Sequence, residues 1–516
     1  MRRTPLMVLT VLALVVSACG EQATSPSSDT GGSEPAGSEP AGNGASGEVT
    51  IALPEEPTNL EPAKWEIDVV RVVKNVVEPL IDRAPTGELV PKLATDWEQV
   101  DDVTWRFTLR EGVTYHNGEP FNAEAAAFGI NRALDPAKEF SVAPVVVPMT
   151  ASAVDEFTLE VTTEEPEAAL PNLMYYLLLP EPGATGEEAD LREPVGTGPY
   201  QVSAFEAGER IVLDAYAGYW GEAPSIATAE FVWRPDSVVR ASMVEAGEAD
   251  IAVEISSGDA DESTIKSVVI PETPLYRLDP PCAALNDIRI WEAVDHAIDR
   301  QLLVDSLYEG FATPASHIIT PDVAGYNEGI EVSEFDPELA RSLVEEAAAD
   351  GVPVDTEVTL MARPGFFPQS EELNEAVSNM LNEIGMNTTT LSLEANAWLE
   401  ANVLKPVPPD RCMMVQSSHG NEVGDAVTTL RTFYLTTGTF FCCDETIDQM
   451  ISDAATLTGD ERYSAFQEVF EAAAGNFVEA PIPLFHLEAL YSVSPELQWE
   501  PRFDRVIHVA TMDLGG

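Results

Sequence analysis

The stretch of residues 194–220 constrains the fold of this chain more than any other segment. It reads PVGTGPYQVSAFEAGERIVLDAYAGYW, in which Gly196 and Gly198 mark a turn. Residues 200–205 and 210–216 then alternate apolar and polar side chains on either side of an Ala-Gly-Glu turn. Because alternation with a period of two is typical of a half-buried strand, the segment predicts a β-hairpin preceded by a glycine turn.

The two glycines also invite comparison with a phosphate-binding loop, which needs a third glycine and opens a helix. The third glycine position is occupied by Gln201, and a strand rather than a helix follows. We therefore interpret Gly196 and Gly198 as a structural turn.

The charge balance excludes nucleic acid as a partner. The 516 residues include 27 basic and 88 acidic side chains, which leaves a formal net charge of −61. Such a surface repels phosphate backbones, and it is interpreted either as a solvated acidic surface or as one that also favours cationic solutes at long range. With 45% apolar residues, the chain is long enough to form several folding units with large buried cores.

The first residues predict export and a lipid anchor. Arg2 and Arg3 precede an apolar run at 6–16, and small residues at 16–18 precede Cys19. This pattern resembles a bacterial lipoprotein signal, which implies a signal peptide at 1–18 and a lipid on the Cys19 thiol. An ordinary secretory signal with an incidental cysteine is the alternative, and the arginine pair is a weak match to a twin-arginine signal.

Residues 19–47 predict a lipidated cysteine followed by a flexible linker. Ser, Gly, Pro, Ala and Glu dominate this segment, and SEPAG occurs twice in tandem. A flexible chain of this length spans about 30 Å, which is enough to hold a globular body away from a membrane. No later stretch reaches about 18 consecutive apolar residues, so no transmembrane helix is expected.

Four other segments carry distinctive motifs. They are NLEPA at 59–63, VVEPLI at 76–81, YHNGEPF at 115–121 and NDIRIWEAVDHAIDR at 286–300. Together with the hairpin, these motifs resemble those of the family 5 extracellular solute-binding proteins, which serve ABC importers of peptides, nickel and related solutes. The resemblance covers the chain from about residue 49 to its C-terminus. It implies an α/β, two-lobed periplasmic-binding-protein-like fold, in which the lobes close on a hinge.

The resemblance also implies domain boundaries, whereas periodicity alone indicates only a mixed α/β chain with several sheets. The expected parts are lobe I at 48–80, 191–278 and 486–516, an accessory domain of lobe I at 81–190, and lobe II at 279–485. Capping residues predict where helices begin within these parts. Asn122, Asp336 and either Asn286 or Asp287 can each cap a helix, and a further helix is expected at 370–384.

The expected ligand site lies in the segment 416–430. Peptide-binding members of the family carry D-x-x-[DE]-P-x-x-x-L, whose first Asp pairs with the α-amino group of the peptide. Aligning Leu430 with the last position places Glu422 at the first acid, Asp425 at the second and Ala426 at the Pro. The resemblance therefore implies that Glu422 pairs with a ligand ammonium and that Asp425 lies near it. A solvated loop carboxylate is the alternative for Glu422.

His419 and Trp398 complete the candidate site. His419 could hydrogen-bond a ligand or a carboxylate, although a lone histidine is more often structural. Trp398 could stack on ligand side chains, with core packing as the equal alternative.

No metal ligand set, cofactor or catalytic group is expected. The chain has six histidines with none closely paired, and it has no Cys-x-x-Cys pair. His116 lies in a turn that is structural in the family. The absence of GxSxG and HExxH motifs argues against the alternative of a secreted hydrolase.

Four cysteines remain after lipidation, an even number in an oxidising compartment. They are Cys282, Cys412, Cys442 and Cys443, and they allow three pairings. We favour Cys282 with Cys412, because both lie at lobe beginnings or inner strands. This choice leaves Cys442 and Cys443 as a vicinal pair or as free thiols.

These observations predict a binding protein rather than an enzyme. We expect a monomeric, exported lipoprotein on the outer face of the cell membrane, or in the periplasm of a cell with two membranes. It is expected to capture a peptide or peptide-like solute between two lobes and to deliver it to the permease of an ABC importer. Nickel chelates, glycans and other cationic solutes are the alternative ligands, and an envelope sensor or chaperone is the alternative role.

Overall fold

The structure, a computed structural model, describes residues 45–185, 191–279, 281–403, 408, 411–421, 423–440 and 442–515. The expected leader, Cys19 and most of the linker lie outside the described residues. Residues 43–516 form one compact unit. The described residues of this unit form two large sheets, a four-stranded sheet and two two-stranded sheets.

The largest sheet has eight strands. They are β1 (Glu48–Leu53), β8 (Tyr200–Glu206), β9 (Arg210–Ala215), β10 (Thr228–Trp233), β11 (Ile251–Val253), β12 (Ile265–Val269), β14 (Ala312–Pro314) and β19 (Phe485–Val493). Seven lie in the order β12-β19-β11-β1-β10-β9-β8, and β14 pairs with β19. β1 is parallel to both of its neighbours, whereas the other pairs are antiparallel. This mixed order means that strands distant in sequence form one surface.

The predicted hairpin is confirmed as the antiparallel pair β8 and β9, with Gly208 in the turn at φ +78°. Gly196 and Gly198, which precede the hairpin, lie where two backbone segments pack closely against each other. A Cβ atom on Gly196 would lie 2.0 Å from the carbonyl oxygen of Val76, and one on Gly198 would lie 2.6 Å from that of Asn75. Only glycine fits these two positions without a shift of the neighbouring backbone.

The second large sheet has five strands. They are β13 (Thr273–Leu278), β15 (Glu357–Ala362), β16 (Asn387–Ser392), β17 (Met413–His419) and β18 (Ile482–Pro483), in the order β16-β15-β17-β13-β18. The helices of this region of the chain are α5 (Ile288–Ala297), α6 (Arg300–Leu307), α7 (Pro337–Ala349), α8 (Ser370–Glu383), α9 (Ala395–Val403), α10 (Ala426–Phe433), α11 (Glu445–Ala455) and α12 (Gly459–Ala473). The alternation of strands and helices gives the α/β lobe that the sequence predicts.

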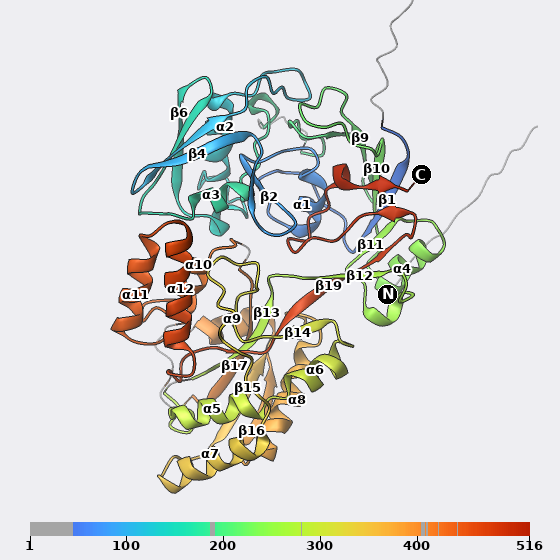
Figure 1. The fold of residues 1–516 in the computed structure, drawn as a ribbon. Helices are drawn as coiled ribbons and strands as arrows, with labels where there is room; N and C mark the ends of the chain where they lie inside the picture. The colour runs from blue at the N-terminus through green and yellow to red at the C-terminus, as the bar shows by residue number, and fades with distance from the viewer. Residues whose placement is uncertain are drawn as a thin grey trace, which may run out of the picture. The chain divides into compact units, whose positions relative to one another are not determined.

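A four-stranded antiparallel sheet forms a third layer. Its strands are β4 (Ala94–Asp101), β5 (Thr104–Leu109), β6 (Met149–Asp155) and β7 (Thr158–Thr163), in the order β4-β5-β7-β6, and α2 (Ala123–Ala133) lies beside it in Figure 1. Two small sheets pair β2 (Ile81–Arg83) with β3 (Leu89–Pro91), and β20 (Leu497–Gln498) with β21 (Asp513–Leu514). The remaining helices are α1 (Ile67–Val73), α3 (Leu170–Leu173) and α4 (Ser237–Glu245), with short 3-10 turns at Ala143–Val145, Met174–Tyr176, Pro182–Thr185, Ser257–Asp259 and Val509–Thr511.

The predicted helix caps are observed. The side chain of Asn122 accepts a hydrogen bond from the Ala125 amide at the start of α2, and Asp336 accepts from two amides at the start of α7. Of the two candidates before α5, Asp287 is the cap. These contacts satisfy amides that the helix cannot pair internally, which is why local sequence predicts them well.

The chain passes between the two large sheets through adjacent segments. Residues 270–272 join β12 of the first sheet to β13 of the second, and Leu484 joins β18 to β19. Hydrogen bonds tie these passages together, from the Ile270 amide to Leu487 and from the Leu484 amide to Pro274. β19 lies beside β12 in Figure 1. Paired crossings of this kind form a hinge about which two lobes can close.

The expected boundary between the lobes, at 278/279, differs from the position where the chain changes sheets. Strand β13 belongs to the five-stranded sheet, so the change occurs at 270–272. The sequence does not reveal this change because β13 is buried almost throughout. Its residues therefore show no alternation of apolar and polar side chains that would mark the start of a new sheet.

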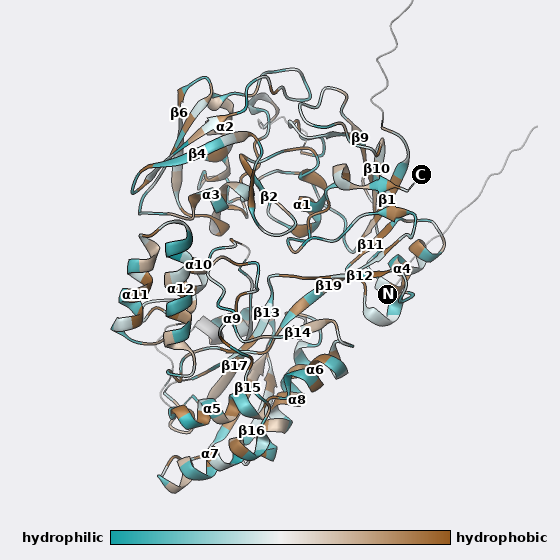
Figure 2. Ribbon diagram, in the orientation of Figure 1, coloured by the Kyte–Doolittle hydropathy of each residue, from teal (hydrophilic) through white to brown (hydrophobic). Residues whose placement is uncertain are grey.

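The helices of the second lobe carry both hydrophobic and hydrophilic residues. Figure 2 shows α5 and α7 with both brown and teal segments along their length, as expected for helices with one buried face. Within the described parts of the chain, no helix combines the length and the apolar character needed to cross a membrane.

Candidate functional site

Two small pockets meet where the chain crosses between the sheets. One has a volume of about 190 Å³ and the other of about 220 Å³, and both are lined by Pro271 and Arg505. The first pocket is otherwise lined by residues of the first lobe, including Trp65, Arg83, Tyr175, Tyr176, Phe503 and Asp504. The second is lined by Glu272, Phe366, Ser418 and Gly420, among others. The hinge therefore carries a composite cavity with walls from both lobes.

An aromatic cluster with buried cations forms the wall of the first lobe. The rings of Trp65, Tyr175 and Tyr176 meet edge to face, with centroids 4.7 to 5.8 Å apart. The Lys74 ammonium lies 3.1 Å from the centroid of Tyr175, and the Arg83 guanidinium lies 4.7 Å from the same centroid. Cations over ring faces hold such rings in place.

Charged partners hold the far side of Tyr175. Its hydroxyl donates to Asp504 over 2.9 Å, and Asp504 accepts a second bond from Arg502 over 2.6 Å. Burial alone would raise the pKa of Asp504, but Arg502 holds it below its usual value. Burial lowers the pKa of the Lys74 ammonium to about 8, although Asp82 opposes the shift. These contacts thus fix the position of the Tyr175 ring in the wall.

Arg505 is held at the cavity by a buried ion-pair network. The Arg71 side chain, fully buried, donates to the carbonyl oxygen of Arg505 over 3.3 Å, to Glu254 over 2.6 Å and to Asp68 over 2.6 Å. Burial opposes the charge of Arg71, but Glu254 raises its pKa above the ordinary value. Arg505 has φ +57°, and Glu254 has φ +51°. Arg71 thus holds the backbone of Arg505, and the Arg505 guanidinium lies 3.9 Å from the Glu254 carboxylate.

The wall of the second lobe supplies the opposite charge. Glu272 lies in the hinge segment, and the Ser418 hydroxyl at the end of β17 approaches its carboxylate at 3.4 Å. Phe366 lines the same pocket. Glu272 and Arg505 both line this pocket, so they give the cavity one acidic and one basic side chain, an arrangement suited to a solute with both charges.

Direct contacts also join the lobes beside the cavity. The carbonyl oxygen of Val423 accepts hydrogen bonds from Arg83 over 2.5 Å and from Asn172 over 3.1 Å. Farther out, the Arg431 guanidinium pairs with Glu167 of the accessory sheet region at 3.1 Å. These contacts bring the loop that follows β17 against the first lobe.

Asp425, a predicted ligand-site residue, is engaged in a structural pair. Its carboxylate caps α10 through the Val427 amide at 2.9 Å and receives Arg462 in a two-pronged contact at 3.1 and 3.2 Å. The Asp425 and Arg462 side chains are each 3% exposed. The carboxylate is therefore fully committed to the protein, and it lines neither pocket.

His419 and Trp398 also turn toward the protein. The His419 ring bonds the Thr429 hydroxyl at 2.7 Å and packs against Phe433, and burial lowers its pKa to about 4. Trp398 is 4% exposed and packs with Met361 and Val415. Neither side chain lines the two pockets, although Ser418 and Gly420 flank His419 and do. Glu422 lies outside the described residues.

No local pattern in the sequence marks the residues that line the cavity or hold its walls. Tyr175 and Asp504 are 329 positions apart, and Arg71 and Arg505 are 434 positions apart. Only the composition points to such residues. The chain has 27 basic residues, and an arginine that is buried needs a specific partner for its charge.

The four described cysteines form two disulfides. Cys282 is joined to Cys412, with 130 positions between them and Cα atoms 4.8 Å apart. Cys442 is joined to its neighbour Cys443, which has φ +79°. No group of three or more His, Cys, Asp or Glu residues in the described segments is arranged to hold a metal ion.

Comparison with known proteins identifies the fold and the family. Residues 88–441 match the family described as bacterial extracellular solute-binding proteins, family 5. The chain is 26% identical over 387 residues to the nickel-binding periplasmic protein of Escherichia coli (strain K12), covering 68% of this chain and 72% of that protein.

A second relative and a solved structure extend the comparison. The dipeptide-binding protein of the same organism is 26% identical over 353 residues, covering 61% of this chain and 65% of that protein. The fold matches that of an ABC transporter substrate-binding protein from Listeria monocytogenes with a TM-score of 0.77 and 18% identity, over 92% of this chain and 100% of the other. Members of the matched family bind solutes and are not enzymes. This chain therefore belongs to the family 5 bacterial extracellular solute-binding proteins.

Proposed function

We propose that this protein is the lipid-anchored solute-binding component of an ABC importer, and that it closes its two lobes over a peptide or peptide-like solute. The observation that carries the proposal is the composite cavity at the hinge, where Arg505 and Glu272 offer opposite charges beside aromatic rings. A short peptide carries an ammonium, a carboxylate and apolar side chains, which match these three features. Closure excludes water and strengthens each contact.

Thermal unfolding tests this function directly. The protein without its leader and with Cys19→Ser is heated alone, with pooled short peptides, and with the same peptides N-acetylated. A ligand at about 100 times its dissociation constant adds about 2.7 kcal/mol, which raises the melting temperature by several degrees. Stabilisation by free but not acetylated peptides supports capture through the ammonium. An unchanged melting temperature with every peptide pool would contradict a peptide as the solute.

Nickel chelates are the second candidate, favoured by the relative named as nickel-binding. A chelate carries carboxylates that Arg83 and Arg505 could receive, so no protein ligand to the metal is required. In the same unfolding experiment, a shift with a nickel chelate that is absent with the metal-free chelator would favour this candidate over peptides.

Glu422 remains the proposed partner of the ligand ammonium. Glu422→Gln is expected to weaken peptide binding by about 2 kcal/mol, or about thirtyfold, because the amide keeps the shape but removes the charge. Isothermal titration with a peptide that shifts the melting temperature measures the change. Glu222→Gln, at an exposed position of the first lobe, is the matched control. Unchanged affinity in Glu422→Gln would remove this residue from the site.

Cys19 is the proposed anchor. Cys19→Ser is expected to move the protein from the membrane fraction to the soluble exported fraction, because no lipid can be attached to the serine. Fractionation of cells that export each version measures the shift, with the double substitution of Cys442 and Cys443 by serine as a control for loss of other cysteines. Retention of the Cys19→Ser protein in the membrane fraction would contradict the anchor.

A further inference from the structure

A third cavity lies within the second lobe, separate from the hinge. It has a volume of about 330 Å³ and is bounded by α5, the end of α12, β18 and the loops at 315–318 and 330–333. It shares no lining residue with the two hinge pockets. Any occupant of this cavity is therefore distinct from the solute held between the lobes.

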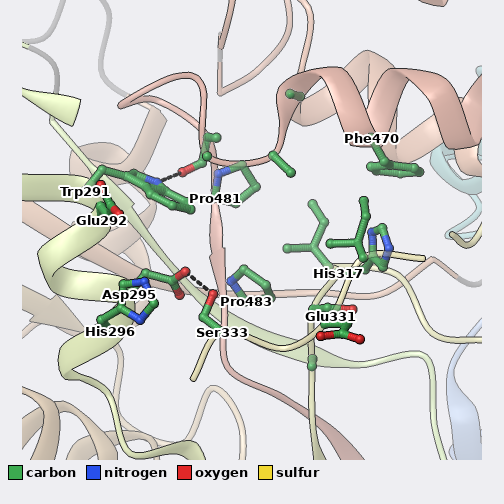
Figure 3. A pocket seen from close by; sticks show the side chains of 18 of the residues that line it. Trp291, Glu292, Asp295, His296, His317, Glu331, Ser333, Phe470, Pro481 and Pro483 are labelled. Carbon is green, nitrogen blue, oxygen red and sulfur yellow. Dashed lines mark hydrogen bonds between the residues drawn. The ribbon is translucent and has the colours of Figure 1, made fainter. Parts of the chain in front are cut away.

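Aromatic rings and prolines form the apolar walls. The Trp291 indole N–H donates to the carbonyl oxygen of Ala480 over 2.8 Å, so the ring is fixed in place. Figure 3 shows Trp291 on the side of the cavity formed by α5 and Phe470 on the opposite side, with Pro481 and Pro483 between them. Tyr434 also lines the cavity. Ring faces of this kind attract cations as well as apolar groups.

The one arginine that lines the cavity is already committed. Arg300 donates to the carbonyl oxygens of Pro483 and Asp295 over 3.0 and 3.1 Å and forms an ion pair with the Asp295 carboxylate. The second oxygen of Asp295 accepts from the Ser333 hydroxyl. This group is internally neutral, and it leaves no positive charge to meet an anion.

The uncommitted polar groups are mainly acceptors. Glu292 and Glu331 are solvent-exposed residues that line the cavity, and within the described chain neither carboxylate has a hydrogen-bond or ion-pair partner. Glu292 comes from α5, and Glu331 lies on the side of His317 in Figure 3. His296 and His317 each use one ring nitrogen to bond a backbone carbonyl. The cavity therefore combines buried aromatic rings with two unpaired carboxylates that are exposed to solvent.

We propose that this cavity is a second ligand site, and that it binds a small organic cation, an amine or a guanidinium. The carboxylates of Glu292 and Glu331 receive the N–H donors, and the rings of Trp291 and Phe470 cover the apolar part of the ligand and face its charge. The inference rests on the cavity and its lining and does not depend on the function proposed for the hinge.

Benzylamine is the probe, because it joins an ammonium to an aromatic ring. Titration calorimetry of the protein with Cys19→Ser is expected to show binding of one benzylamine, weaker binding of the uncharged benzyl alcohol, and no binding of benzoate. The double substitution Glu292→Gln with Glu331→Gln is expected to weaken benzylamine binding by about five- to tenfold, because both charges are lost from a partly exposed site.

Two further variants complete the test. Glu345→Gln with Glu468→Gln removes the same charge from exposed positions on α7 and α12 outside the cavity, and it is expected to leave benzylamine binding unchanged. Ala474→Phe, at an exposed lining position, is expected to abolish binding by filling the cavity. Equal affinity for benzylamine and benzyl alcohol, or benzylamine binding that survives both the double Gln substitution and Ala474→Phe, would overturn the proposal.

Discussion

Replacing Arg462 by methionine is expected to lower the free energy of unfolding by about 3 to 5 kcal/mol, because it strands a buried carboxylate. Arg462 meets both oxygens of Asp425, and both side chains are almost fully buried. The same guanidinium donates to the carbonyl oxygen of Ala455 at the end of α11 over 2.8 Å. The substitution therefore removes a charge partner and a helix contact together, and urea denaturation measures the loss.

The interpretation of Arg462→Met needs two comparisons. Arg462→Met combined with Asp425→Asn is expected to be less destabilised than Arg462→Met alone, because no unpaired charge is then buried. Arg289→Met, which breaks ion pairs with Asp287 and Asp350 on the surface, is expected to have a much smaller effect. An Arg462→Met protein as stable as the parent would show that this pair does not support the loop beside the hinge.

Removing the disulfide between Cys282 and Cys412 is expected to lower the free energy of unfolding by about 2 to 5 kcal/mol. The bond links residues 130 positions apart, so it closes a long loop and restricts the unfolded chain strongly. It also joins the segment after β13 to the residue before β17, whose far end reaches the hinge cavity. The double substitution by serine, followed by urea denaturation, measures the effect.

The second disulfide provides a matched control. Cys442 and Cys443 are adjacent in sequence, so their bond removes little freedom from the unfolded chain. Their double substitution by serine is expected to cost much less than that of Cys282 and Cys412. Equal losses from the two double substitutions would contradict the loop-closure argument.

The cavity at the hinge and the pair of Asp425 and Arg462 are linked by one loop. Val423 contacts Arg83 of the first lobe, and two positions later Asp425 is clamped to α12. Because the ion pair of Asp425 with Arg462 lies close to the cavity, it holds this loop in one position when the lobes meet. Ligand affinity is therefore expected to depend on residues that never touch the ligand.

Local features were predicted well from the sequence. The hairpin of β8 and β9 follows from alternation and a Gly208 turn, and the starts of α2 and α7 follow from Asn122 and Asp336. Each of these signals acts within a few residues, so neighbouring side chains determine the backbone without help from the rest of the fold. The family motifs extend this success to the fold class.

The candidate site was predicted less well, because the position of each of its side chains depends on contacts with residues far away in the sequence. Asp425 has the residue type and the place of a ligand acid, yet Arg462 of α12 uses both of its oxygens. His419 lies beside the cavity, but its ring meets Thr429 and Phe433 of α10. The packing of α10 and α12 therefore directs the side chains of Asp425 and His419 toward the protein interior, and short motifs do not encode such packing.

By itself, the sequence determined the α/β class, the family, the hairpin and the helix caps, since each depends on contacts between near neighbours. Only the tertiary structure decided which charges face the hinge. The sheet order places β19 between β12 and β11, and the segment after it brings Arg505 to Arg71 and Asp504 to Tyr175. Burial then requires each charge to find a partner, and that partner is set by the folded geometry rather than by distance along the chain.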